Sequence, residues 1–311
     1  MAYTVDILLA TYNGARYLDE LLVSLDKQDF TNWRLLVRDD GSTDTTGEIL
    51  ERYSRDNPGR VKLLTDEEQR LGPSINFSRL ISFSDAPYIV FCDQDDIWLD
   101  NKISLSLAAI HKIEQQVDQD VPVLVHSDLK VTDHELNVVA ASFWKFQNIS
   151  PERGETLKRL LVQNVITGNT VIINAALREQ IKSIPAEAIM HDWWIGLVAS
   201  AMGKIGRINE PTILYRQHAL NDTGAKQWGF SYIINKIKRL KDVRRSLYRT
   251  VEQAGAFLEE KHDMLTGFQR ETVSTYANLL KYSYINRKLI IIRYGFFKHG
   301  VIRTIGMLLI I

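Results

Sequence analysis

Short apolar runs alternate with amphipathic segments through the first hundred residues of the chain. A run of apolar residues bounded by polar ones is typical of a strand that is buried on both faces. Four such runs are present, at Val5–Ala10, Trp33–Arg38, Val61–Thr65 and Tyr88–Cys92. The segments between them predict helices at Gly14–Gln28, in a stretch that ends at Tyr53, and at Ser74–Phe83. Strands that alternate with helices in this way predict βαβ units, and hence an α/β fold with a mainly parallel sheet flanked by helices.

The middle of the chain continues this pattern, and the last part departs from it. Strands are predicted at Val121–Val125, ending at His126, Ser127 and Asp128 near the sheet edge, and at Thr212–Arg216. An apolar helix is predicted at Ile195–Met202, and a helix is expected to begin near Trp98. Beyond residue 228 the pattern predicts long helices, with an apolar stripe at Tyr232, Ile233, Ile237, Leu240, Val243 and Leu247. We therefore predict a domain over residues 1–225, made of halves 1–100 and 101–225, and a basic amphipathic helical extension over residues 226–311.

The formal net charge of zero hides two parts of opposite sign. Residues 226–311 carry 16 Lys and Arg against 6 Asp and Glu, whereas residues 1–225 carry 22 against 32. This asymmetry indicates different partners for the two parts. The single cysteine, Cys92, excludes an internal disulfide and fits a reducing compartment. Residues 1–10 have no basic region or cleavage site of a signal peptide, so a cytoplasmic location is expected.

Three carboxylates, Asp93, Asp95 and Asp96, follow the apolar run Tyr88–Cys92 directly. If that run is a buried strand, the three acids lie at the edge of an open α/β sheet, where ligands usually bind. Acids crowded there repel one another unless a cation lies between them, and oxygen ligands suit Mg²⁺ or Mn²⁺. The alternative is a solvated acidic turn that caps the next helix.

The turn after the first strand, Thr11-Tyr12-Asn13-Gly14, is not a glycine-rich phosphate loop. Its sequence argues against a dinucleotide-binding dehydrogenase and against a P-loop ATPase. The Tyr12 ring could stack on a base, and the Asp40 carboxylate in the next turn could accept a hydrogen bond from a pyrimidine imide. The alternatives are a loop aromatic that covers the sheet edge and an ordinary turn aspartate.

Four motifs in order carry a resemblance to a known family. They are LLATYNGARYLDELLVSL, VRDDGSTDTT, CDQDDIWL and the HDWW tetrad at His191–Trp194. Over roughly residues 4 to 220 the chain resembles the family 2 glycosyltransferases, which are inverting enzymes of the GT-A fold that use nucleotide-sugar donors. Within that family it is similar to bacterial rhamnosyltransferases, through Gly72–Phe77 and Tyr215–His218.

The resemblance implies a donor site in the first half. Tyr12 and Asp40 would hold the nucleobase, and Asp95 with Asp93 or Asp96 would bind the Mg²⁺ or Mn²⁺ that bridges the donor diphosphate. His218 would complete the metal or diphosphate site, although a histidine beside an arginine is also a common structural residue. The other residues expected to contact the nucleotide are Thr11, Asn13, Arg70 and Gln94.

The acceptor half, residues 101–225, would supply the base. By resemblance, Asp192 would take the proton from the acceptor hydroxyl while that oxygen attacks the anomeric carbon, so one displacement inverts the configuration. Trp193 or Trp194 could pack on a sugar ring, and Gly168 and Asn169 would shape the acceptor pocket. The alternative is a helix-capping aspartate with two core tryptophans. Family members often carry Glu before this Asp, and here His191 replaces it.

The basic extension allows two interpretations. Its helices could lie on an anionic membrane surface, which fits an acceptor glycan linked to a polyprenol on the inner leaflet, or they could form a packing subdomain or a homo-oligomer interface. No apolar run reaches the roughly 18 residues that span a bilayer. Nucleic-acid binding is disfavoured because no recognised motif accompanies the charge.

The overall prediction is a metal-dependent inverting glycosyltransferase that moves L-rhamnose from a thymidine diphosphate donor to a lipid-linked bacterial polysaccharide intermediate. A sugar nucleotidyltransferase is the rival enzyme, but it is expected to carry a glycine-rich loop with basic residues after the first strand, and TYNGARYL lacks one. A non-catalytic binding module is the other rival. It predicts loss of the base or of the metal acids, and all of them are present.

Overall fold

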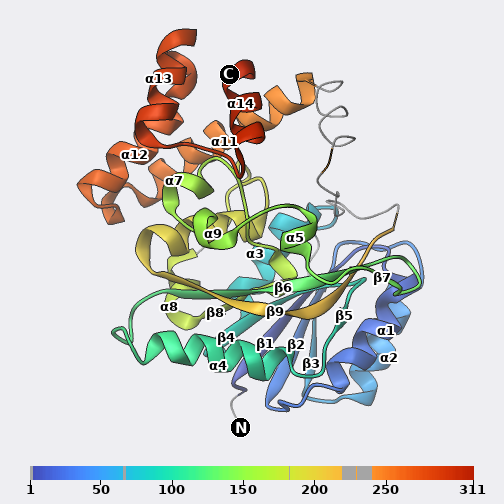
Figure 1. Cartoon of the computed structure of the whole chain (residues 1–311). Coiled ribbons are helices and arrows are strands. Elements are labelled where there is room, and N and C mark those ends of the chain that lie inside the picture. Colours follow the sequence, from blue (N-terminus) through green and yellow to red (C-terminus); the bar gives the residue numbers. More distant parts are fainter. Residues whose placement is uncertain (1–2, 66–67, 182, 219–228, 230–239) are drawn as a thin grey trace.

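A computed structural model describes residues 3–65, 68–181, 183–218, 229 and 240–311. Its described strands form one sheet in the order β3-β2-β1-β4-β8-β6-β9-β5, and β7 pairs with β6 (Figure 1). The strands are β1 (Val5–Thr11), β2 (Trp33–Asp39), β3 (Val61–Leu64), β4 (Tyr88–Asp93), β5 (Ile97–Trp98), β6 (Val123–Thr132), β7 (Val138–Ala140), β8 (Ile172–Asn174) and β9 (Lys204–Arg216). The sheet is parallel from β3 to β4 and mixed beyond it, because β8 runs antiparallel to both of its neighbours.

Helices cover both faces of this sheet, as Figure 1 shows. On one face, α1 (Ala15–Asp26), α2 (Thr46–Asp56) and α4 (Lys102–Glu114) share an apolar core with the strands. On the other face, α3 (Gly72–Phe83), α8 (Ala175–Ile181) and α9 (His191–Met202) contribute to a second core. Short helices α5 (Phe143–Phe146), α6 (Pro151–Gly154), α7 (Leu157–Leu160) and η1 (Gly168–Thr170) lie between β7 and β8. The predicted α/β sheet with flanking helices is confirmed.

The register of the parallel strands brings the predicted motifs together. Thr11 of β1 pairs with Asp39 of β2, and Ala10 pairs with Asp93 of β4. The turns that follow these three strands therefore meet at one edge of the sheet, the edge at which open α/β sheets bind ligands.

Two local predictions were wrong. β6 continues to Thr132, so His126, Ser127 and Asp128 are buried inside the strand and do not follow its end. No helix begins near Trp98, because Trp98 pairs with Ile213 of β9 in the two-residue strand β5, and α4 begins at Lys102. The first error arises because β9 begins at Lys204, eight residues before the strand predicted at Thr212–Arg216, so that Arg207 and Ile208 pair with His126 and Ser127. The partners of β5, Ile213 and Leu214, lie within the predicted strand.

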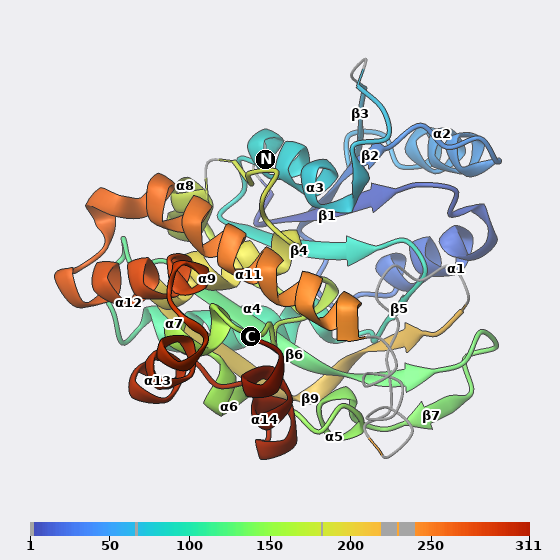
Figure 2. The ribbon, with the colours of Figure 1, turned by 90° about the horizontal axis from the view of Figure 1, so that it is seen from above.

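The chain beyond residue 239 is helical. Its elements are α11 (Leu240–Lys261), η2 (His262–Met264), α12 (Gly267–Ala277), η3 (Leu279–Lys281), α13 (Tyr284–Tyr294) and α14 (Val301–Ile310). Figure 2, which views the molecule from above, shows these helices over α9 and α7. Phe257 of α11 packs edge-on against Trp194 of α9, with 5.5 Å between ring centroids. The apolar stripe predicted at Tyr232, Ile233 and Ile237 lies outside the described residues. Within the described part of the chain, no helix has the length and apolar character needed to cross a bilayer.

Candidate active site

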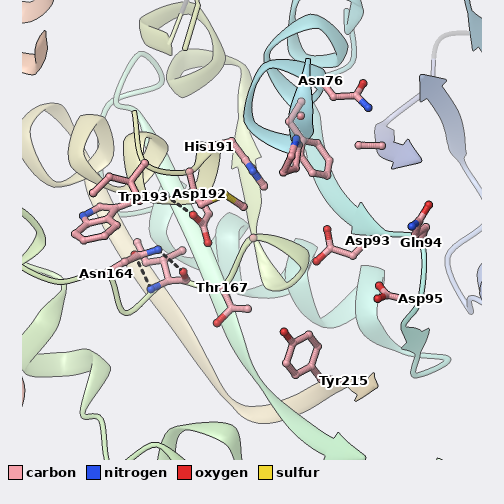
Figure 3. Close-up of a pocket in the computed structure, with 18 of the residues that line it drawn as sticks. Asn76, Asp93, Gln94, Asp95, Asn164, Thr167, His191, Asp192, Trp193 and Tyr215 are labelled. Atoms are coloured by element: carbon pink, nitrogen blue, oxygen red, sulfur yellow. Dashed lines mark hydrogen bonds between the residues drawn. The ribbon is translucent and has the colours of Figure 1, made fainter. Parts of the chain in front are cut away.

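A cleft of about 1010 Å³ lies between the carboxyl ends of β1, β2 and β4 and the N-terminal end of α9. Figure 3 shows Asp93, Gln94 and Asp95 on one side of it and Asp192 and Trp193 on the other. The predicted site residues that line it are Thr11, Tyr12, Asp40, Arg70, Asp93, Gln94, Asp95, Gly168, Asp192 and Trp193. The structure thus brings the predicted donor residues and the predicted base into one cleft.

The Gln94 side chain fixes the backbone of Tyr12, in the turn that follows β1. The Tyr12 N–H donates to Gln94 Oε1 at 2.9 Å, and Gln94 Nε2 donates to the Tyr12 carbonyl at 2.9 Å. A Cβ at Gly14 would lie 2.2 Å from Gln94 Oε1, so only glycine allows this close approach. Asn13 does not line the cleft. Its Oδ1 accepts from the Thr43 N–H at 2.8 Å, which ties the two turns together. The Tyr12 ring is left 45% exposed at the cleft.

Asp40 is buried and anchors the loop before α3. Its carboxylate accepts from the Leu71 and Gly72 N–H groups at 3.0 and 2.8 Å, and it pairs with buried Arg38 at 3.1 Å. Arg70 is exposed at the cleft and has a left-handed backbone, with φ of 60°. Asp40 therefore fixes the loop that presents Arg70, in addition to lining the cleft itself.

Two carboxylates form the acidic side of the cleft, and an imidazole contacts one of them from behind. Asp93 and Asp95 are half-buried and line it, and His218 lies behind Asp95, with 2.7 Å between Nε2 and Oδ2. The His218 ring stacks on Tyr17 at 4.8 Å. Within the described residues, no three His, Cys, Asp or Glu side chains surround one metal position. The set still fits Mg²⁺ or Mn²⁺, because Mg²⁺ is usually bound by one or two carboxylates together with substrate phosphates and waters.

Asp96, the third acid, takes no part in the cleft. It is fully buried, and its carboxylate accepts from the Arg216 backbone N–H at 3.0 Å and from the Asn169 side chain. Burial, and then the nearby charges of Asp95 and Asp93, raise the pKa of Asp96 well above its usual range. Asp96, one of the three acids predicted for the metal site, and Asn169, predicted for the acceptor pocket, therefore do not line the cleft. The two residues join the acidic turn to β9 and η1.

Asp192 stands at the start of α9, half-buried and open to the cleft. Its Oδ1 accepts from the Trp193 N–H at 2.6 Å. Burial raises the pKa of Asp192 to about 7, while hydrogen bonds from the Trp193 and Gly168 backbones and from the Asn164 side chain act in the opposite direction. A carboxylate with this pKa can take up and release a proton near neutral pH, as a general base must.

The two tryptophans after Asp192 point in different directions. Trp193 lines the cleft, and its Nε1 donates to the Leu160 carbonyl at 2.5 Å. Trp194 is fully buried against Phe257 of α11, so it joins α9 to the helical extension. Of the two tryptophans predicted for the acceptor site, Trp193 therefore lines the cleft and Trp194 does not.

His191 is buried beside the base. The centroid of its ring lies 4.0 Å from that of the Phe77 ring and 5.5 Å from that of the Phe91 ring. Neither nitrogen of the His191 ring has a hydrogen-bond partner among the described residues. Burial lowers the pKa of His191 to about 3. A Cβ at Gly168 would lie 2.7 Å from His191 Nε2, so glycine is needed where η1 meets α9. His191 is thus a neutral ring in the cleft wall.

Replacing His191 with Phe should make stability less sensitive to acid. The unfolded chain binds a proton at this histidine below pH 6.5 and the folded chain does not until about pH 3, so the wild type loses stability as the pH falls through that window. Between pH 7 and pH 5 the variant should gain about 2 kcal/mol relative to the wild type. Urea unfolding at both pH values measures this difference, with the exposed-site variant His262→Phe as the control. Parallel pH dependences of His191→Phe and the wild type would count against the buried neutral ring.

The cleft is also lined by residues that were not predicted as site residues, and three of them carry polar side chains near the predicted acids. Tyr215 of β9 lines it, and Asn164 and Thr167 line it near Asp192 (Figure 3). Burial, followed by the charges of Asp96, Asp93 and Asp95, raises the pKa of Tyr215. A sequence signal existed for Asn164, which is a polar residue between the apolar pairs Leu161–Val162 and Val165–Ile166.

Known proteins resemble this chain in sequence and in fold. The model of glycosyl transferase family 2 matches residues 6–180, more than half of the chain. RfbG of Shigella flexneri, a dTDP-rhamnosyl transferase, is 29% identical over 246 residues, which span 78% of this chain and 81% of that protein. WfgD of Escherichia coli, a UDP-Glc:alpha-D-GlcNAc-diphosphoundecaprenol beta-1,3-glucosyltransferase, is 33% identical over 110 residues, 35% of this chain and 42% of that protein.

A solved structure shares the fold. The mannosyltransferase PcManGT of Pyrobaculum calidifontis, in complex with GDP-Man and Mn²⁺, matches with a TM-score of 0.53 and 14% sequence identity, over 94% of this chain and 73% of its own. This likeness supports the predicted fold. Because the family model covers more than half of the sequence, the chain belongs to glycosyl transferase family 2.

Proposed function

We propose that this glycosyltransferase moves L-rhamnose from dTDP-rhamnose to a hydroxyl of a lipid-linked bacterial polysaccharide intermediate, with inversion at the anomeric carbon. The observation that carries the proposal is the placement of Asp192 across the cleft from Asp93 and Asp95 (Figure 3). A base on one side and a leaving-group site on the other are what a single displacement requires.

Asp192 acts as the base in this scheme. Its carboxylate takes the proton of the acceptor hydroxyl as that oxygen bonds to the anomeric carbon, and the bond from that carbon to the donor diphosphate breaks. Its pKa of about 7 suits this task, because a base with a pKa near the working pH combines a large ionised fraction with a strong pull on the proton. Trp193, next to the base, offers a flat apolar face to a sugar ring.

Asp93 and Asp95 would hold a divalent cation, with His218 orienting the Asp95 carboxylate. The cation, when bound, stabilises the negative charge that develops on the departing diphosphate. Tyr12, which is exposed and lines the cleft, would stack on the base of the donor. Two relatives support the two finer assignments. RfbG is a dTDP-rhamnosyl transferase, and WfgD acts on a diphosphoundecaprenol-linked sugar.

A donor screen tests this proposal. The purified chain is melted with Mn²⁺ and, in turn, dTDP-rhamnose, dTDP-glucose, UDP-glucose and GDP-mannose. We expect dTDP-rhamnose to raise the melting temperature most. Stronger protection by a UDP or GDP sugar would overturn the donor assignment alone, whereas protection by no nucleotide sugar would contradict the donor site.

Replacing Tyr12 with Ala should weaken binding of dTDP. Stacking of one base on an aromatic ring contributes about 1–3 kcal/mol, so the Kd should rise by about tenfold or more. Isothermal titration with dTDP measures the change. Tyr282→Ala is the matched control, because Tyr282 is a comparably exposed tyrosine on the helical extension (40% exposed, against 45% for Tyr12). Equal affinities in the two variants would contradict a stacking role for Tyr12.

A further inference from the structure

The helices α13 and α14 carry apolar side chains on their outer faces. Ile285, Leu289 and Ile292 recur at helical spacing along α13, and α14 adds four more. Each of the seven side chains is between 51% and 74% exposed; those of α14 are Val301, Ile302, Ile305 and Leu309. Arg287 of α13 donates to the Ile311 carbonyl at 3.0 Å, so the two helices are neighbours. We call these seven side chains the outer apolar face. Exposed apolar stripes of this kind usually mark a binding surface.

The surroundings of the outer apolar face are positively charged. Residues 272–311, which include both helices, contain six Lys and Arg and no Asp or Glu. On α13, Lys288 and Arg293 lie on either side of the stripe formed by Ile285, Leu289 and Ile292, because residues three and four apart share a helix face. An apolar stripe flanked by cations is typical of a helix that lies in the interface of an anionic bilayer.

The same segment is attached to the wall of the cleft. The Arg303 guanidinium donates to the Gln147 and Asn148 carbonyls at 2.5 and 2.9 Å, and the His299 N–H donates to Gln163 Oε1 at 3.0 Å. Gln147 and Gln163 line the cleft. The segment that carries the outer apolar face is therefore hydrogen-bonded, through Arg303 and His299, to the cleft wall formed by residues between β7 and β8.

We propose that the outer apolar face docks on an anionic lipid bilayer, with the seven apolar side chains in the interface and Lys288 and Arg293 at the headgroups. Docking in this way would hold the cleft wall of Gln147 and Gln163 near the surface, where a lipid-linked acceptor is confined. A second copy of the chain fits less well, because a two-fold interface places the same patch against itself and so opposes its cations. The inference does not depend on the identity of the donor.

Co-sedimentation of the full chain with vesicles tests the inference. One vesicle preparation is phosphatidylcholine alone, and the other also contains phosphatidylglycerol. The wild type should bind the anionic vesicles, and the triple variant Ile285→Ser, Leu289→Ser, Ile292→Ser should bind them about tenfold more weakly. The double variant Lys288→Gln, Arg293→Gln should lose most of the preference for anionic lipid. The assay contains no nucleotide sugar, so its result is independent of the proposed donor.

The matched control carries three serines at exposed apolar positions of the first domain, Val23→Ser, Phe83→Ser and Val138→Ser. It should bind vesicles like the wild type. Melting curves of all variants check the fold, which should survive because every substituted apolar side chain is exposed. Absence of wild-type binding, or equal loss in the control, would overturn the proposal. A dimer in size-exclusion chromatography that the α13 triple variant dissolves, without vesicle binding, would overturn it in favour of self-association.

Discussion

Replacing Asp192 with Asn is expected to lower kcat by about 10²- to 10⁴-fold, the range that general-base catalysis contributes. The amide has nearly the same shape as the carboxylate and can still accept the Trp193 N–H through its oxygen, so the start of α9 should keep its structure. It cannot take a proton from the acceptor hydroxyl. Binding of dTDP should change little, because Asp192 lies across the cleft from Tyr12 and Asp95. Initial rates of dTDP release and isothermal titration measure the two effects.

Glu187→Gln is the control for this substitution. Glu187 is an exposed acid just before α9 and does not line the cleft, so its loss removes one negative charge from the same region without touching the site. Its turnover should match that of the wild type. If Asp192→Asn also kept near-normal turnover, the proposed base would be wrong.

Replacing Asp95 with Asn should remove the part of nucleotide affinity that depends on the cation. Loss of a partner outside the coordination sphere already costs about 10- to 100-fold in metal affinity, so loss of a direct ligand should cost at least as much. His218, whose Nε2 lies 2.7 Å from Asp95 Oδ2, would lose this contact with a carboxylate as well. Titration of dTDP with and without Mn²⁺ measures the dependence.

The control is Asp100→Asn, since Asp100 is an exposed acid near the end of the same acidic segment and lies outside the cleft. In the wild type and in this control, Mn²⁺ should tighten dTDP binding. The outcome that would remove Asp95 from the cation site is an Asp95→Asn variant in which Mn²⁺ still tightens dTDP binding to the wild-type extent.

The sheet edge at which the turns after β1, β2 and β4 meet could be predicted, because the sequence features that indicate it are local. Each strand of the parallel part is a short apolar run, and the polar residues that follow it must lie at its end. Parallel register then brings Thr11, Asp39 and Asp93 to one edge without further information. The raised pKa of Asp192 was not predictable in this way, because it depends on burial by residues from separate elements.

Predicted site residues that lie outside the cleft are held there by partners that are distant in sequence. Asp96 is one of three similar acids in sequence, and it is distinguished by its burial and by hydrogen bonds from the Arg216 backbone, 120 residues away, and from the Asn169 side chain. Likewise, adjacent residues of a helix point in different directions, and only the position of α11 shows that Trp194 is the inner tryptophan. The local sequence pattern identifies each motif. Tertiary contacts determine which residues of the motif line the cleft and which are buried in the core.

The helical extension shows a similar limit. Its amphipathic pattern fits either packing or membrane contact, and the structure contains both kinds of face. Phe257 and Ile291 are buried in the core shared with α9, while Ile285 and Leu289 remain exposed. The amphipathic pattern alone does not predict which apolar side chains of these helices are buried by the rest of the chain.

The pH dependence of kcat/KM tests whether Asp192 is the base of the transfer reaction. Burial raises the pKa of this carboxyl to about 7, so below that pH a growing fraction of the enzyme carries a protonated and inactive base. We predict that kcat/KM for dTDP-rhamnose rises about tenfold per pH unit below pH 7 and levels off above it. The residual kcat/KM of Asp192→Asn should not show this rise with pH. A wild-type profile that is flat from pH 5 to pH 8, or the same rise in Asp192→Asn, would contradict the account.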